Sequence, residues 1–177
     1  HPIVRNSLNL LNIQDRLEIS SIADIPGYGT GLGSSSSYCV GLLKALTEIK
    51  NLDFNKEKIA ELACKVEINM CQEPIGKQDQ YAAALGGYNK LVFKPNGTVS
   101  REQIRLSNDF KRYFESHWLG IYTGITRNAK KILQEQNMQI KNKNKIYLMD
   151  DIVKLVDPFC SSLQKEDINE LGKILNY

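Results

Sequence analysis

The chain has 177 residues, of which 42% are hydrophobic and 24% are charged, and these proportions are typical of a globular protein with a substantial core. Lys and Arg number 23 against 20 Asp and Glu, and a formal net charge of +3 is too even to predict a nucleic-acid partner. No apolar run approaches the roughly 20 residues that a membrane span requires, and no signal peptide opens the sequence, so we expect a cytoplasmic protein without a membrane partner.

The first half of the chain predicts helices, one strand and one loop of small residues. Apolar residues recur at helical spacing over 2–12, and residues 17–22 alternate as in a strand. Apart from Pro26, Tyr28 and Leu32, residues 26–37 are only Gly, Ser and Thr. An apolar stripe over 38–50 predicts a helix that begins near Ser34. Further helices are expected over 56–71, with Asn55 as N-cap, and over 78–85, before Gly86-Gly87.

The second half predicts a β-hairpin followed by helices. Residues 88–93 and 99–106 flank the turn sequence Pro95-Asn96-Gly97-Thr98. A buried strand is expected over 118–123, and helices over 127–136, over 145–163 and after Asp167. The lysine-rich run at 141–145 has no aromatic residues between its charges and predicts a solvated loop. Because strands and helices mix without a regular βαβ order, the predicted fold class is α+β.

Cysteine and histidine are too sparse for several kinds of site. The four cysteines form no Cys-x-x-Cys pair, and Cys64 and Cys71 lie in apolar sequence that predicts buried thiols. Only His1 and His117 are present, which argues against a histidine-based zinc site or catalytic triad.

The loop at 26–37 is the most informative segment. Glycines let the backbone approach a ligand closely, and small residues at a helix start leave several N–H groups directed at one point. The helix dipole adds roughly half a positive charge there, so the segment predicts an anion site whose usual occupant is phosphate. Serine hydroxyls add donors for phosphate or an oxygen ligand for Mg²⁺. The alternative, a flexible Gly/Ser linker, does not explain the strand and amphipathic helix expected on either side.

Among phosphate-binding patterns, the loop resembles one kinase family. It lacks Gly-x-x-x-x-Gly-Lys-Ser/Thr and Gly-x-Gly-x-x-Gly, and the chain lacks His-Arg-Asp and Asp-Phe-Gly. Gly31-Leu32-Gly33-Ser34-Ser35-Ser36 resembles the second motif of the GHMP kinases, which include galactokinase, homoserine kinase and mevalonate kinase. Tyr28 makes the stretch after Pro26 one residue longer than the family pattern. The resemblance implies that the triphosphate of ATP is bound by Gly29, Thr30, Gly31, Leu32, Gly33, Ser34, Ser35 and Ser36.

A second motif follows at the distance that this family has. Family members place a Mg²⁺-binding glutamate on the second helix after the loop, then an aspartate after a turn, then Gly-Gly. Glu67 and Asp79 occupy these positions before Gly86-Gly87. The resemblance assigns Mg²⁺ to Glu67 and the Ser35 hydroxyl, with Ser34 as second choice, and makes Asp79 the catalytic base or positioner. Without it, Glu67 would be an exposed helix charge and Asp79 a first-turn residue favoured by the dipole.

Three more residues are candidates for substrate contact. Residues 122–128 run from the expected strand into a helix, in a region where the family carries residues that face the acceptor. This implies contacts from Thr126 and Arg127, and a guanidinium suits a sugar phosphate, although a capping or surface role for Arg127 stays open. Lys77 is a candidate for neutralising phosphate charge, with a surface lysine as the equal alternative.

Within the GHMP kinases, residues 22–133 resemble most the D-glycero-D-manno-heptose 7-phosphate kinases, bacterial enzymes that phosphorylate C1 of a heptose phosphate for surface polysaccharide (lipopolysaccharide) synthesis. The resemblance implies a ribosomal protein S5 domain 2-like N-terminal domain over 1–108, incomplete at its start, and a truncated C-terminal domain over 109–177. It implies ATP and Mg²⁺ as cofactors and a sugar or sugar-phosphate substrate, and it leaves a homodimer open. The alternatives are another GHMP kinase, such as a galactokinase or fucokinase, and a nucleotide-binding relative without catalysis.

Overall fold

The computed structural model describes residues 1–14, 16–24, 31–121, 129–141 and 146–176. The chain divides into two compact units, which are taken in turn below. Unit 1 comprises His1–Gly86 with Tyr122–Gln136, and unit 2 comprises Gly87–Ile121 with Asn137–Tyr177. The domain boundary expected at residue 108 stays a prediction.

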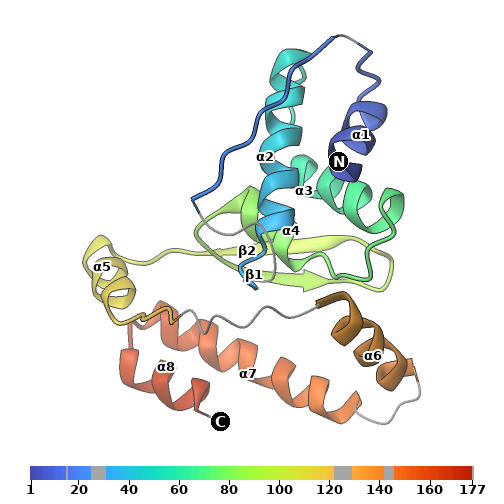
Figure 1. Ribbon diagram of the computed structural model, residues 1–177. Helices are drawn as coiled ribbons and strands as arrows, with labels where there is room; N and C mark the ends of the chain where they lie inside the picture. Colours follow the sequence, from blue (N-terminus) through green and yellow to red (C-terminus); the bar gives the residue numbers. More distant parts are fainter. Residues whose placement is uncertain (15, 25–30, 122–128, 142–145, 177) are drawn as a thin grey trace. The chain divides into compact units, whose positions relative to one another are not determined.

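Unit 1 is built around helix α2 (Ser34–Ile49), and three other helices, α1 (Pro2–Leu10), α3 (Lys56–Cys64) and α4 (Gln78–Leu85), pack against it (Figure 1). The side chain of Asn55 accepts a 2.8 Å hydrogen bond from the Lys58 N–H, so it caps α3 as predicted. These four helices confirm the helical pattern of the sequence. The helix expected over 56–71 is not α-helical throughout, because α3 passes at Lys65 into the π-helix η1 (Lys65–Met70).

The core of unit 1 lies where the apolar stripe of α2 meets α3 and η1. Leu43 and Leu46 of α2 are almost completely buried, together with Ala63 and Val66. Burial of one leucine side chain stabilises a fold by roughly 1.5–3 kcal/mol, so this stripe fixes α2 along its length. The start of α2 therefore has a rigid support, which matters for the site described below.

Two predicted strands do not form in the described residues. Residues 17–22 have no regular secondary structure, and Ile22 is 97% exposed. Residues 118–121 are also irregular, whereas 122 and 123 lie outside the described residues. A strand is stable only when its N–H and C=O groups pair with a neighbour. The described part of the chain offers neither segment such a neighbour, since its single sheet contains only β1 and β2.

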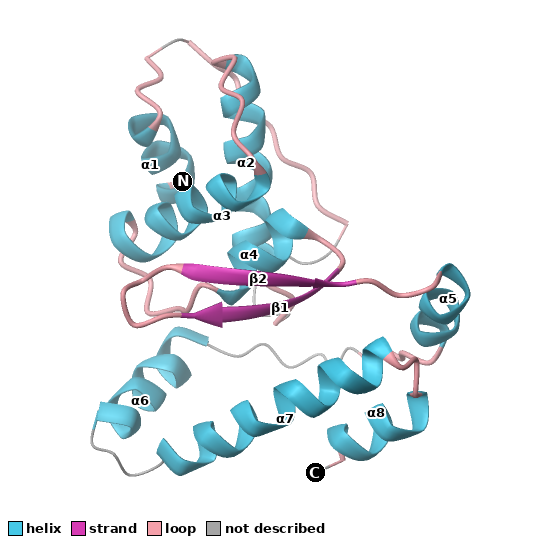
Figure 2. Cartoon of the chain, turned by 180° about the vertical axis from the view of Figure 1, so that it is seen from behind, coloured by secondary structure: helices cyan, strands magenta, loops and turns pink. Residues whose placement is uncertain are grey.

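Unit 2 contains the predicted hairpin, with β1 (Tyr88–Phe93) antiparallel to β2 (Val99–Ile104) (Figure 2). The register pairs Tyr88 with Ile104 and Phe93 with Val99. The turn between the strands closes through the Lys94 N–H, which donates to the Thr98 carbonyl at 2.9 Å, and Gly97 takes the left-handed φ of 85°. The Pro95–Thr98 turn prediction is confirmed.

The rest of unit 2 is helical. Helix α7 (Ile146–Gln164) and helix α8 (Ile168–Leu175), which Asp167 caps, were predicted, but α5 (Asn108–Ser116) was not. Phe110 and Phe114 lie four residues apart on α5 and pack with Ile104, Leu163 and Leu171. Helix α6 (Ala129–Lys141), which begins in unit 1 and ends in unit 2, extends further than expected at its C-terminal end. Among the helices of the described residues, none has both the length and the apolarity to cross a membrane.

Candidate active site

The start of helix α2 is arranged as an anion site in the described residues. Gly33 precedes the helix in the left-handed conformation, with φ 64° and ψ 25°, which glycine adopts without a Cβ penalty. Its carbonyl accepts the first helical hydrogen bond from the Ser37 N–H at 3.0 Å. No described side chain caps the helix, so the N–H groups of its first turn are directed outward without an intrahelical acceptor. Such a helix start suits a phosphate.

A buried carboxylate lies directly under this helix start. The Ser35 hydroxyl donates to Glu67 Oε1 at 2.6 Å, and the Ser36 hydroxyl donates to Glu67 Oε2 at 2.7 Å. Gln80 Nε2, from α4, donates to the same Oε2 at 2.7 Å. Three donors compensate for the removal of the charge from water. Glu67, which is 1% exposed, thus joins α2, η1 and α4 at one point.

The π-helix explains why the Glu67 side chain reaches this position. The Cys71 N–H donates to the Val66 carbonyl at 2.8 Å, a span of five residues that widens the turn, and the Glu73 N–H donates to the Glu67 carbonyl at 3.0 Å. A π-turn changes the direction of the side chains that follow it compared with a continuous α-helix. Short π-segments of this kind are frequent at functional sites.

Asp79 also lies at this helix start, next to Gly33. It is exposed in the first turn of α4, where the helix dipole favours a carboxylate. A Cβ placed on Gly33 would lie 3.2 Å from Asp79 Oδ2 and 3.3 Å from Asp79 Cγ. The Asp79 side chain therefore packs against the Gly33 backbone. Both predicted carboxylates are thus brought to the beginning of α2, one buried and one open to solvent.

We predict that Gly33→Ala weakens nucleotide binding and lowers stability. An added methyl group has to fit a left-handed backbone position, at a cost of roughly 1–2 kcal/mol, and it pushes the Asp79 carboxylate away. Nucleotide titration and thermal unfolding of Gly33→Ala measure the two effects. Gly41→Ala is the matched control, since Gly41 lies inside α2 with open space around it and no positive φ. Equal nucleotide affinity in the two variants would contradict a role for the left-handed Gly33 backbone in nucleotide binding.

The remaining predicted site residues lie as follows. Gly31 has φ 73° with open space around it, Leu32 is 67% exposed, and Ser34 is half-buried as the first residue of α2. Lys77 precedes α4 as its N-cap residue and is half-buried. Four predicted residues lie outside the described residues: Gly29, Thr30, Thr126 and Arg127.

The thiols near the site are not nucleophiles. Burial raises the pKa of Cys39 to about 12, and the negative charge of Glu67 adds to the effect. Burial also raises the pKa of Cys64 to about 11, against an opposing contribution from the positive charge of Lys77. Both thiols are therefore protonated at neutral pH. The predicted burial is confirmed for Cys64, whereas Cys71 is only half-buried.

The donor set of this site fits a weakly held divalent cation. Mg²⁺ takes only one or two protein ligands and keeps several waters, and hydroxyl and carboxylate oxygens are its preferred donors. Ser35 Oγ and Glu67 Oε1 are adjacent, and Ser35 is the exposed member of the pair, so the approach is from its side. Across the ranges that the structure describes, no group of three His, Cys, Asp or Glu side chains forms a dedicated metal cluster.

Gln80 is the residue of this site that the sequence analysis missed. Its side chain is completely buried, although it is polar and adjacent to the exposed Asp79. One signal was available, since Gln80 lies on the same helical face as Tyr81, Ala84 and Leu85, where an apolar residue is expected. A glutamine on the apolar face of a short helix indicates a specific hydrogen-bond partner.

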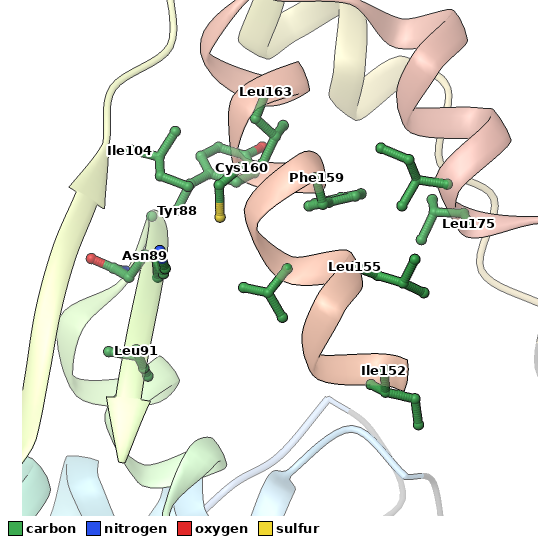
Figure 3. Close-up of a pocket in the computed structure, with 14 residues that line it drawn as sticks. Tyr88, Asn89, Leu91, Ile104, Ile152, Leu155, Phe159, Cys160, Leu163 and Leu175 are labelled. Carbon is green, nitrogen blue, oxygen red and sulfur yellow. The ribbon is translucent and has the colours of Figure 1, made fainter. Parts of the chain in front are cut away.

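Unit 2 contains an apolar groove of different chemistry. Its volume is about 480 Å³, and its lining includes Tyr88, Leu91 and Ile104 of the hairpin and Leu155, Phe159 and Leu163 of α7 (Figure 3). None of the residues that line it is Asp or Glu, and Lys90, at its edge, forms an ion pair with Asp157. Burial raises the pKa of the lining thiol Cys160, which keeps it protonated. The groove thus lacks the acidic groups that phosphoryl transfer needs.

Comparison with known proteins relates this chain to the GHMP kinases. Residues 3–87 match the family model of the GHMP kinases N terminal domain. The chain is 32% identical over 157 residues to a D-glycero-alpha-D-manno-heptose 7-phosphate kinase of Campylobacter jejuni, covering 89% of the chain and 46% of that protein. It is 29% identical over 178 residues to a galactokinase of Pyrococcus furiosus, with 86% and 49% covered.

A solved structure agrees with these sequence matches. The crystal structure of a D-glycero-D-manno-heptose 1-phosphate kinase from Bacteroides thetaiotaomicron superposes with a TM-score of 0.75 at 26% identity, covering 98% of the chain and 52% of that protein. The chain spans about half the length of the relatives it matches. Residues 3–87, which hold α2, η1 and α4, form a GHMP kinase N-terminal domain. The mixed α and β fold of this kinase family is confirmed.

Proposed function

We propose that this chain is part of an ATP-dependent kinase that transfers the γ-phosphoryl group to a sugar hydroxyl. One observation carries the proposal. At the start of α2, whose first N–H groups are directed outward, Glu67 accepts hydrogen bonds from Ser35 and Ser36, and Asp79 packs against Gly33. An anion site flanked by two carboxylates is what positioning of a triphosphate and a hydroxyl nucleophile requires.

Each group has a separate role in the proposal. The first turn of α2 and the 29–36 segment hold the triphosphate through backbone N–H groups and serine hydroxyls. Glu67 and Ser35 hold Mg²⁺, which would neutralise phosphate charge when bound. Asp79, exposed at the helix start, accepts the proton of the acceptor hydroxyl or holds that hydroxyl in line.

The acceptor we propose is a heptose phosphate, phosphorylated at C1. The support is that a heptose 7-phosphate kinase and a heptose 1-phosphate kinase are among the relatives, with 32% and 26% identity. Thr126 and Arg127 stay predicted acceptor contacts, and Lys77 stays a predicted phosphate contact. Galactose or fucose is the second candidate acceptor, since a galactokinase matches at 29% identity and a fucokinase at 28%.

An acceptor screen on the full-length protein tests the function. Purified protein with ATP and Mg²⁺ is given D-glycero-D-manno-heptose 7-phosphate, galactose, fucose, mevalonate or homoserine, and ADP release is followed. We expect the heptose phosphate to give the highest kcat/KM. A higher value for another sugar would change the acceptor and keep the kinase. Nucleotide binding without acceptor-dependent ADP release would overturn the kinase proposal and favour a non-catalytic relative.

A further inference from the structure

We propose that Gln80 is a positioning residue of this site. It orients the Glu67 carboxylate and connects helix α4, which carries Asp79, to the start of α2. The inference rests on the proposed kinase function. Its basis is the bond from Gln80 Nε2 to Glu67 Oε2, at 2.7 Å, between two side chains that are both buried.

The hydrogen bonds of Glu67 divide unequally between its two oxygens. Oε2 accepts from Gln80 Nε2 and from Ser36 Oγ, each at 2.7 Å, and both donors are buried. Oε1 accepts from the exposed Ser35 hydroxyl, at 2.6 Å. Two donors saturate the lone pairs of Oε2, whereas Oε1 accepts from the exposed Ser35 alone and keeps a lone pair next to it. Gln80 thus selects which oxygen remains available to a cation at the helix start.

The orientation of the Gln80 amide follows from chemistry. An ionised carboxylate only accepts hydrogen bonds, so the NH₂ end of the amide must face Glu67. Gln80 Oε1 then lies buried without a hydrogen-bond partner among the described residues. A buried acceptor left unpaired lowers stability, and an apolar side chain of similar length would avoid this cost. Packing alone therefore does not account for glutamine at this position.

Gln80 also connects the two carboxylates. Asp79 precedes it in the first turn of α4 and packs against Gly33, while Gln80 points to the interior and holds Glu67. Adjacent residues of a helix turn move together, so one hydrogen bond fixes Asp79 and Glu67 relative to each other across the start of α2. Alignment of nucleophile and cation to within a fraction of an ångström is what this kind of catalysis depends on.

The first test is Gln80→Met in the full-length protein, with Gln78→Met as matched control. Met keeps the length of the side chain and removes both the donor and the unpaired oxygen. Because Glu67 Oε2 then has Ser36 as its remaining donor, we expect a modest loss of thermal stability in a protein that still folds. Gln78 is exposed in the same helix.

For Gln80→Met we expect nucleotide binding without Mg²⁺ to be unchanged. The Mg²⁺ concentration that half-saturates Mg²⁺-dependent binding should rise, and kcat should fall, each by roughly 10–100-fold. The acceptor KM should change little, and Gln78→Met should behave as wild type.

The second test, Gln80→Glu, is followed by activity and by thermal stability at each pH, because a merely structural role would lower both together. The introduced carboxyl group can donate to Glu67 only while it is protonated. Activity relative to wild type should therefore be retained at acidic pH and fall as pH rises through the pKa of that introduced group. A wild-type Mg²⁺ requirement and kcat in Gln80→Met would overturn the inference, and so would a wild-type pH profile in Gln80→Glu. If Gln80→Met does not fold, the Gln80→Glu profile decides.

The two proposals fail in different ways. Absence of acceptor-dependent ADP release in the wild-type protein would count against the kinase, and the Mg²⁺ titration of nucleotide binding would still test Gln80. An active wild-type protein whose turnover and Mg²⁺ requirement are indifferent to Gln80→Met would count against Gln80 alone.

Discussion

Replacing Glu67 by glutamine is expected to remove the Mg²⁺-dependent part of nucleotide binding and to lower kcat by roughly 10²–10³-fold, while the protein stays folded. Glutamine has the shape of glutamate without its charge. The Ser35 and Ser36 hydroxyls can donate or accept, so they adapt to the new amide. Gln80 can turn its own amide and offer its Oε1, which has no hydrogen-bond partner in the wild-type structure, to the new NH₂ group of residue 67. The hydrogen-bond network is thus kept and the charge is lost.

Glu67→Ala separates this loss of charge from a loss of structure. Alanine leaves Ser36 and Gln80, both buried, without an acceptor, at a cost of roughly 1–3 kcal/mol for each. We therefore expect a clear drop in the free energy of unfolding for Glu67→Ala and a much smaller one for Glu67→Gln. Denaturant titration measures stability, and nucleotide titration with and without Mg²⁺ measures binding. An unchanged Mg²⁺ requirement in Glu67→Gln would remove Glu67 from the cation site.

Replacing Asp79 by asparagine is expected to lower kcat by roughly 10²–10⁴-fold in the full-length protein, with nucleotide affinity almost unchanged. Asparagine keeps the packing against Gly33 but cannot accept the proton of a hydroxyl group. Because Asp79 is exposed in the described structure, stability should change little. ADP release and nucleotide titration of the same preparation measure the two quantities.

Asp53→Asn is the matched control for this prediction. Asp53 is an exposed aspartate in the segment before α3, so it loses the same charge outside the site. We expect its turnover to equal that of the wild type. If Asp79→Asn and Asp53→Asn release ADP at the same rate, Asp79 is neither base nor positioner, and the acceptor hydroxyl is activated by another group.

Local chemistry explains which parts of the fold could be predicted. The apolar stripe of α2, the Asn55 cap and the Asn96-Gly97 turn depend on residues close in sequence, and the structure confirms all three. The strand expected over 17–22 does not form, because alternation of side chains gives a strand only where a neighbour pairs with it. Helix α5 was missed although Ser107 caps it and Phe110 and Phe114 have helical spacing.

The residues of the candidate site could be predicted from the sequence better than their geometry. The small-residue loop and the family resemblance predicted Glu67 and Asp79 as site residues, and the structure places both carboxylates at the start of α2. The burial of Glu67 was not predictable, because it follows from the packing of α2, η1 and α4 around it. The π-turn could not be predicted either, since no residue of Lys65–Met70 distinguishes a π-helix from an α-helix.

The π-turn has a consequence for how this site tolerates changes in chain length. A π-turn holds one residue more than the α-turn it replaces, so a deletion within 65–66 would let the helix continue in regular α form without breaking it. Because Glu67 lies inside the π-turn, its side chain would then leave the helix in a different direction relative to Ser35 and Ser36. A single-codon deletion would thus separate Glu67 from Ser35 and remove the proposed cation site, although both residues were still encoded.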